Sequence, residues 1–175
     1  MTILHDKDAH MEDIIGKTIA IIGYGSQGRA QALCLRDSGI NVIIGETEIL
    51  GGMKNPSWQK AEADGFQVLS ISIAAKMADI IHILLPDEFH GVIFKKSIEP
   101  YMTKGKTLSC SHGFAIVYEQ IIPPGDVDVI MVAPKSPATE ERKAFLAGFG
   151  VPGLIAVKQD FTGKGIVIAL MDAGY

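Results

Sequence analysis

Long hydrophobic runs, clustered basic residues and paired cysteines are missing from this sequence, and each absence excludes a class of protein. No apolar run approaches the length of a membrane span, and the charged N-terminal stretch MTILHDKDAHMEDI lacks the apolar centre of a signal peptide. No run of Lys or Arg offers a nucleic-acid footprint, and the formal net charge is -4. Cys34 and Cys110 match neither a disulfide framework nor a zinc spacing. These features predict a cytoplasmic protein with small-molecule partners, no nucleic acid and no membrane.

The composition is that of a globular chain. With 175 residues, 47% of them hydrophobic and 21% charged, the chain is long enough to bury one sizeable core. Short apolar runs alternate with helical-looking segments along its length. This alternation predicts a Rossmann-like α/β fold, with a doubly wound, mostly parallel sheet and helices on both faces. We interpret residues 1–175 as a single dinucleotide-binding domain.

The expected elements follow from apolar runs, capping residues and glycine stops. We expect strands at Thr18–Ile22, Asn41–Ile44, Gln67–Leu69, Ile80–Leu85, Thr107–Ser111, Val127–Val132 and Leu154–Val157. We expect helices at Gln27–Ser38, Trp58–Asp64, Ile71–Met77, Glu88–Ser97 and Val117–Gln120, and a further helix that starts at Gly163. Ser57 is expected to cap the second helix. His82 lies inside an apolar strand and is interpreted as a core residue, and Cys110 as a buried thiol.

Three glycines stand between the first strand and the first helix, in the stretch KTIAIIGYGSQGRAQALCLRDSGINVIIGE. In a dinucleotide-binding unit, Gly23 permits the tight turn, Gly25 lets the backbone approach a pyrophosphate, and Gly28 lets the helix pack closely on the strand. The free amides at the helix start then face the anion. The turn predicts nucleotide binding, and a purely structural turn is the alternative.

The loop after the second strand, GETEILGGMKNPSW, is expected to meet the adenosine ribose. Glu46 or Glu48 could accept hydrogen bonds from the ribose hydroxyls and would repel a 2′-phosphate, whereas Lys54 and Ser57 could hold such a phosphate. A solvated loop, in which Ser57 only caps the helix, is the alternative interpretation.

Several motifs in one order carry a family resemblance. The stretches GKTIAIIGYGSQGRAQALCLRDSG, ILLPDE, SHGF, PPGDVDVIMVAPKSP and GFGVPGLIAVKQD resemble the N-terminal domain of ketol-acid reductoisomerase, from about Asp6 to Asp160. The resemblance implies a role in branched-chain amino-acid biosynthesis. The reaction would be a magnesium-dependent alkyl shift on 2-acetolactate or 2-aceto-2-hydroxybutyrate, followed by reduction with NAD(P)H to a 2,3-dihydroxy acid.

The resemblance also assigns roles to individual residues. His112 in SHGF matches the catalytic histidine, and Lys135 in APKSP matches a lysine of the active site; both follow predicted parallel strands, where open α/β sheets place ligands. The implied cofactor contacts are Gly23, Tyr24, Gly25, Ser26, Gln27, Gly28, Glu46, Thr47, Ser57, Leu85, Pro86, Asp87, His90 and Gly113.

The sequence departs from the family pattern at a few positions. The family usually has glutamine at His90 and commonly arginine at Thr47, and its PKGPG motif reads PKSPA here. Because the guanidinium is lost between two glutamates, we predict that NADH binds at least as well as NADPH. The family's magnesium carboxylates belong to a helical C-terminal domain, and no such motif precedes Tyr175, so we expect no metal ligand in this chain and a homo-oligomer only at full length.

Two other functions fit the glycine turn. A β-hydroxyacid dehydrogenase shares it, but that group commonly places its catalytic lysine on a helix. A non-catalytic nucleotide-sensing Rossmann module would use the same fold, without a reason to keep His112 and Lys135 at the carboxyl edge of the sheet.

Overall fold

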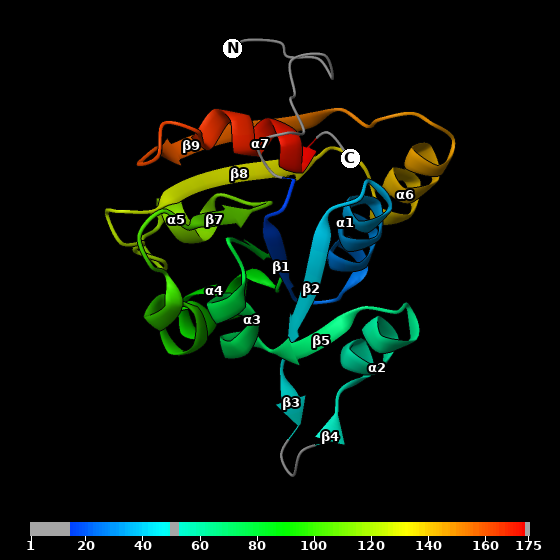
Figure 1. Cartoon of the computed structure of the whole chain (residues 1–175), viewed down its shortest axis with the longest axis horizontal. Helices are drawn as coiled ribbons and strands as arrows, with labels where there is room; N and C mark the ends of the chain where they lie inside the picture. Colours follow the sequence, from blue (N-terminus) through cyan, green and yellow to red (C-terminus); the bar gives the residue numbers. More distant parts are fainter. Residues whose placement is uncertain (1–14, 50–52, 174–175) are drawn as a thin grey trace.

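A seven-stranded sheet runs through the computed structural model, which describes residues 15–49 and 53–173, in the order β5-β2-β1-β6-β7-β8-β9 (Figure 1). Its strands are β1 (Thr18–Ile22), β2 (Asn41–Glu46), β5 (Gln67–Ser70), β6 (Ile80–Ile83), β7 (Thr107–Cys110), β8 (Asp128–Pro134) and β9 (Gly153–Gln159). The strands β3 (Glu48–Ile49) and β4 (Met53–Lys54) form a separate hairpin. The helices are α1 (Ser26–Asp37), α2 (Pro56–Ala63), α3 (Ile71–Met77), α4 (Asp87–Ile93), α5 (Phe114–Val117), α6 (Ala138–Leu146) and α7 (Gly165–Ala173).

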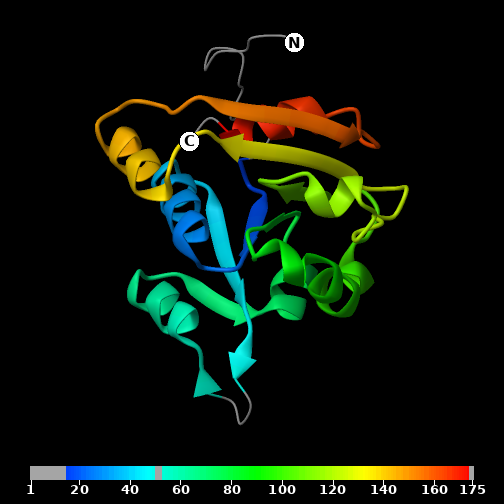
Figure 2. The ribbon, with the colours of Figure 1, turned by 180° about the vertical axis from the view of Figure 1, so that it is seen from behind.

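The sheet is parallel except at one edge. β1 pairs with β2 on one side and with β6 on the other, so the strand order reverses direction beside β1. In open α/β sheets, ligands bind at the carboxyl ends of the strands near such a reversal. β9 runs antiparallel to β8, and Figure 2 shows the two side by side from behind. The prediction of a doubly wound, mostly parallel sheet is confirmed.

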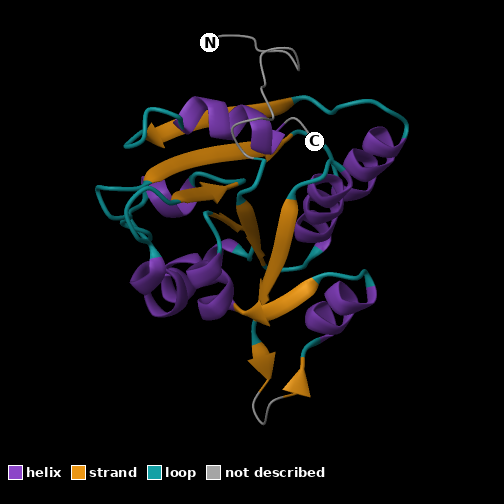
Figure 3. Ribbon diagram, viewed as in Figure 1, coloured by secondary structure: helices purple, strands orange, loops and turns teal. Residues whose placement is uncertain are grey.

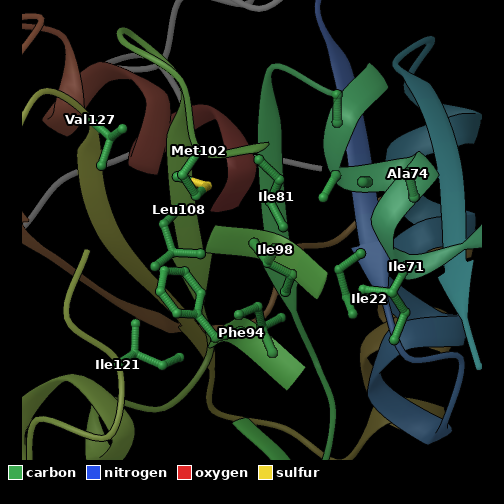
Figure 4. Packing of buried hydrophobic residues seen from close by; sticks show 14 of the residues in the cluster. Ile22, Ile71, Ala74, Ile81, Phe94, Ile98, Met102, Leu108, Ile121 and Val127 are labelled. Carbon is green, nitrogen blue, oxygen red and sulfur yellow. The ribbon is translucent and has the colours of Figure 1, made fainter. Parts of the chain in front are cut away.

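Helices cover both faces of the sheet (Figure 3). On one face, side chains of α1, α2 and α7 pack on strand residues such as Ile19, Ile21 and Ile130. On the other face, α3 and the turns after α4 pack on Ile22 and Ile81. Figure 4 shows this second core, where strand side chains meet the helical residues Ile71, Ala74, Phe94 and Ile98. The continuous apolar strands follow from burial on both faces.

Several expected elements have different bounds in the structure. Asn55, and not Ser57, caps α2, because Asn55 Oδ1 accepts from the Trp58 amide at 2.8 Å. The expected helix at 88–97 is α4 followed by a π-helical turn at Phe94–Ile98. The short helix expected at Val117–Gln120 is wrong: α5 ends at Val117.

The glycine turn brings α1 unusually close to β1. Gly23 has a φ of 97°, and a Cβ there would lie 2.9 Å from Leu85 Cδ2 and 3.1 Å from the Leu84 carbonyl oxygen. A Cβ on Gly28 would lie 2.0 Å from the Gly23 carbonyl oxygen, which no real side chain tolerates. These two positions therefore require glycine for the fold itself.

We predict that Gly28→Ala destabilises the free protein by about 3 kcal/mol, because α1 must move away from β1 to admit the methyl group. Gly25→Ala is the matched control: Gly25 has a φ of -74°, and a Cβ there meets nothing within 4 Å. Urea unfolding should separate the two variants clearly. Equal midpoints would show that the helix start can relax around a Cβ at position 28.

Candidate cofactor site

The start of α1 presents backbone amides at the carboxyl end of β1. The turn is closed by the Gly23 amide, which donates to the Gly45 carbonyl at 3.0 Å. Gly25 then stands at the N-cap position in an extended conformation, and Ser26 and Gln27 begin the helix. Amides in the first turn of an α-helix have no partner within that helix, and the helix dipole favours an anion there. The open space at Gly25 leaves room for a pyrophosphate, so these residues fit the predicted ligand.

Glu46 ties the end of β2 to this turn. Its side chain is buried, and its Oε1 accepts from the Tyr24 amide at 2.6 Å. Its Oε2 accepts from the Thr47 amide and from Asn55 Nδ2, both at 3.1 Å. A carboxylate offers about four acceptor positions, so one position on Oε1 remains for a ribose hydroxyl. A hydrogen bond from a ribose hydroxyl to Glu46 stays a prediction.

Tyr24 does not face the pyrophosphate, although the sequence placed it among the cofactor contacts. Its amide is used by Glu46, and its side chain is 1% exposed. Its hydroxyl donates to Asp64 Oδ2 at 2.9 Å, and Arg29 holds the same carboxylate through two bonds. Burial and the Asp64 carboxylate raise the pKa of Tyr24 above its ordinary value, so the phenol stays neutral. Tyr24 therefore supports the turn from inside.

The ribose loop is organised by Asn55, which the sequence analysis missed. Besides capping α2, Asn55 donates through Nδ2 to the Thr47 carbonyl at 2.7 Å. The sequence signal was the pair Asn55-Pro56, since proline favours the first helical position and asparagine the cap before it. Lys54 pairs with Glu62 on α2 at 2.5 Å, and Ser57 is half-buried at the second position of the helix. Glu48 lies in β3.

The ILLPDE segment follows β6, and a buried side chain of α4 fixes its position. Leu85 and Pro86 lead into α4, whose first residue is Asp87. His90 is 3% exposed, and its Nε2 donates to the Leu85 carbonyl at 2.7 Å. The other ring nitrogen, Nδ1, is buried and has no hydrogen-bond partner among the described residues. His90 thus fixes the loop before α4 through Nε2, and its contact with the cofactor stays a prediction.

His112 stands at the open edge beyond β7. Its side chain is 65% exposed, and its Nδ1 accepts from the Phe114 amide at 3.2 Å. The neutral ring therefore carries its proton on Nε2, where it can donate to a ligand. Asp87 Oδ2 lies 3.6 Å from His112 Nδ1, so the segments after β6 and β7 meet here. Gly113 forms the N-terminal end of α5 between His112 and Phe114.

Lys135 stands at the same edge beyond β8, the neighbour of β7. Its side chain is exposed, and its amide donates to the Pro152 carbonyl at 2.8 Å. Gln27 Nε2 donates to the carbonyl of the next residue, Ser136, at 3.2 Å. The structure therefore gathers the glycine turn, the Asp87–His112 pair and the Lys135 loop along one edge. A groove of about 590 Å³ lies beside α4, lined by Glu88, Gly91, Val92, Lys95, Lys96 and Gln120, and it contains none of the predicted site residues.

The sequence matches the family model described as acetohydroxy acid isomeroreductase, NADPH-binding domain, over residues 13–174. The chain belongs to the ketol-acid reductoisomerase family. The predicted family and the prediction of an NAD(P)H-binding domain with a Rossmann-like fold are confirmed. The β-hydroxyacid dehydrogenase alternative is set aside by this match.

Two named reductoisomerases show how close the relation is. The chain is 61% identical to ketol-acid reductoisomerase (NAD(+)) of the uncultured archaeon GZfos26G2, over 97% of this chain and 51% of that protein. It is 58% identical to ketol-acid reductoisomerase (NADP(+)) of Akkermansia muciniphila, over 97% of this chain and 50% of that protein. The solved structure of an NADH-preferring ketol-acid reductoisomerase from an uncultured archaeon is 60% identical with a TM-score of 0.94, over 98% of this chain and 52% of that one. The chain spans about half the length of these reductoisomerases.

The described residues of this reductoisomerase-family chain do not fit a magnesium site. Within 15–49 and 53–173, no three His, Cys, Asp or Glu side chains come together as ligands. We therefore assign no step through a metal to these residues. In the same part of the chain, no helix is long and apolar enough to cross a membrane. Cys110 is buried as expected, and burial raises the pKa of its thiol to about 11, which argues against a nucleophile.

We predict that Asp64→Asn lowers stability at neutral pH by about 2 kcal/mol, because Arg29 and Tyr24 lose a charged partner. The bonds from Arg29 hold the pKa of Asp64 below its usual value of 3.8. A lowered pKa means that the stabilisation is complete above about pH 4 and is lost as the pH falls through the folded pKa. Thermal unfolding from pH 3 to pH 7 should show the gap between wild type and variant closing at the acidic end. A gap that stays constant would contradict the role of the charge.

Proposed function

We propose that this chain is the cofactor domain of a ketol-acid reductoisomerase that isomerises and reduces 2-acetolactate or 2-aceto-2-hydroxybutyrate to 2,3-dihydroxy acids. The observation that carries the proposal is the row of free amides at the start of α1, with Glu46 beside it and His112 and Lys135 on the same edge. The amides would bind the pyrophosphate, and the acid the adenosine ribose. His112 and Lys135 would then meet the substrate beyond the nicotinamide.

Within this function, the ribose loop favours NADH. The buried Glu46 carboxylate lies where a 2′-phosphate would approach, and a like-charge contact of this kind costs about 1–2 kcal/mol, or about tenfold in affinity. Lys54 is already paired with Glu62, so its charge is partly neutralised. Ser57 remains as a hydroxyl donor near the loop. The names of the relatives point both ways, because the 61%-identical one is named for NAD(+) and the 58%-identical one for NADP(+). The preference therefore rests on the charges of the loop.

His112 and Lys135 would serve the substrate in different ways. His112 Nε2–H is oriented outward by the bond at Nδ1 and can donate to a substrate oxygen or relay a proton. Lys135 supplies a positive charge for oxygens that become negative during the alkyl shift. Magnesium would supply Lewis acidity in that step, from ligands outside the described residues. A homo-oligomer and a cytoplasmic location remain part of this proposal.

We predict that the 175-residue chain binds NADH at least as tightly as NADPH and does not convert 2-acetolactate. Fluorescence titration with both reduced cofactors at low and moderate salt measures the preference. Gly25→Val should abolish binding while the protein stays folded, because the side chain fills the space in front of the amides. Tenfold tighter NADPH binding that weakens with salt would show that Lys54 and Ser57 hold a phosphate. Conversion of 2-acetolactate by the 175-residue chain alone would contradict the proposal that these residues form only part of the active site.

We predict that His112→Gln in the complete enzyme lowers kcat by about 100-fold and changes cofactor affinity by less than about threefold. The reason is that His112 lies beyond the amides that bind the pyrophosphate. Steady-state kinetics with 2-acetolactate and a separate NADH titration check the two parts. Wild-type turnover by the variant would remove His112 from the reaction.

A further inference from the structure

A chain of hydrogen bonds runs beneath α1 from the glycine turn into the middle of the sheet. Gln31 Nε2 donates to Gln27 Oε1 at 3.2 Å and lies 3.4 Å from Ser111 Oγ. Ser111 Oγ lies 3.1 Å from His82 Nε2, and His82 Nδ1 lies 3.4 Å from Ser109 Oγ. Gln31, His82 and Ser109 are completely buried. Polar side chains thus connect α1 with β6, the central strand, and with its neighbour β7.

The register of the sheet places this chain on the face under α1. His82 stands beside Ile21 on β1 and beside Ser109 on β7, and Ser109 stands beside Ile130 on β8. Ile21 and Ile130 belong to the core that α1 covers, and side chains in one such row share a face. Ser111 follows Ser109 by two positions and therefore faces the same way.

Stability alone does not account for these polar residues. Burying a hydroxyl or amide without a partner costs about 1–3 kcal/mol, and a satisfied pair contributes only about 1 kcal/mol net. Apolar side chains of similar size would fill a row between Ile21 and Ile130 without that cost. Gln31 Oε1 has no hydrogen-bond partner among the described residues, although it is buried. A role in positioning other residues would account for these hydrogen bonds.

Two members of the bond chain, Ser111 and Gln27, lie next to site residues. Ser111 directly precedes His112, and Gln27 donates through Nε2 to the carbonyl of Ser136, which directly follows Lys135. Gln27 itself lies in the first turn of α1. The hydrogen bonds thus join the segments that follow β1, β7 and β8, which carry the amides, His112 and Lys135. Figure 1 shows the three strands that these segments follow.

We propose that Gln31, Ser111 and His82 are positioning residues that set His112 and Lys135 in place relative to the bound dinucleotide. The inference rests on the proposed function for the chemistry of His112 and Lys135, whereas the bond chain itself does not depend on it. In this proposal the three residues act through their neighbours and not by contact with cofactor or substrate. Losing a link should leave the amides and Glu46 intact, so cofactor affinity should hardly change while the loops shift.

The test compares Gln31→Met, which keeps the length of the side chain without the amide, with Ser111→Ala and Ser111→Thr. In the 175-residue chain, we expect Gln31→Met and Ser111→Ala to shift the ring resonances of His112 and to speed hydrogen exchange at the Phe114 amide. NADH affinity should change by less than about threefold. In the complete enzyme, kcat should fall about tenfold in both variants at nearly constant KM for NADH. Ser111→Thr keeps the hydroxyl and should restore both readouts.

Thr107→Val is the matched control, because it removes a buried hydroxyl at the opposite end of β7. It should cost some stability and leave the His112 resonances unchanged. Unchanged His112 resonances in Ser111→Ala, or equal defects in the Ala and Thr variants, would overturn the inference. If Gln31→Met fails to fold, the comparison of Ser111→Ala with Ser111→Thr still tests the inference, because Ser111 is partly exposed and tolerates substitution better. If the complete wild-type enzyme has no activity, the proposed function fails, while the resonance shifts still support the positioning role.

Discussion

The close approach of α1 to β1 determines most of what this structure can do. The Gly23 carbonyl oxygen occupies the place where a side chain at Gly28 would begin, at 2.0 Å, so the helix can start only where glycine stands. This contact aims the first-turn amides past the end of β1. It also brings the second turn of α1 onto the sheet, where Gln31 reaches Ser111, the residue directly after β7. Anion recognition and the buried bond chain are thus two results of one packing constraint.

The Glu46 carboxylate shows how a single charge can serve both fold and ligand. Buried charges are tolerated when several donors surround them, and here Tyr24, Thr47 and Asn55 supply those donors. The same arrangement leaves one acceptor position on Oε1 without a donor among these three. Cofactor choice is therefore connected to the stability of the turn, because a change that admits a 2′-phosphate at Glu46 also removes the partner of the Tyr24 amide.

The sequence predicted the parts that depend on local patterns. The apolar run of β1 and the residues of α3 were found with their observed bounds, and the strand ends correctly placed His112 and Lys135 on one edge. Tertiary contacts decided the rest. Asn55, and not Ser57, caps α2 because Pro56 occupies the first position of the helix. The antiparallel β9 depends on a chain reversal that no periodicity reveals, and His82 looked like an ordinary core residue because its partners come from other elements.

Binding and chemistry place different demands on this edge of the sheet. A dinucleotide can be recognised by the chain as it stands, because the amides and Glu46 are already fixed by internal bonds. Reaction requires more, since an imidazole that is 65% exposed donates to water as readily as to substrate. Phe114 and Tyr118 form an aromatic pair beside His112, with ring centroids 4.6 Å apart, and Tyr118 is 67% exposed. In the proposed function, His112 would therefore need a second surface that excludes water from its ring.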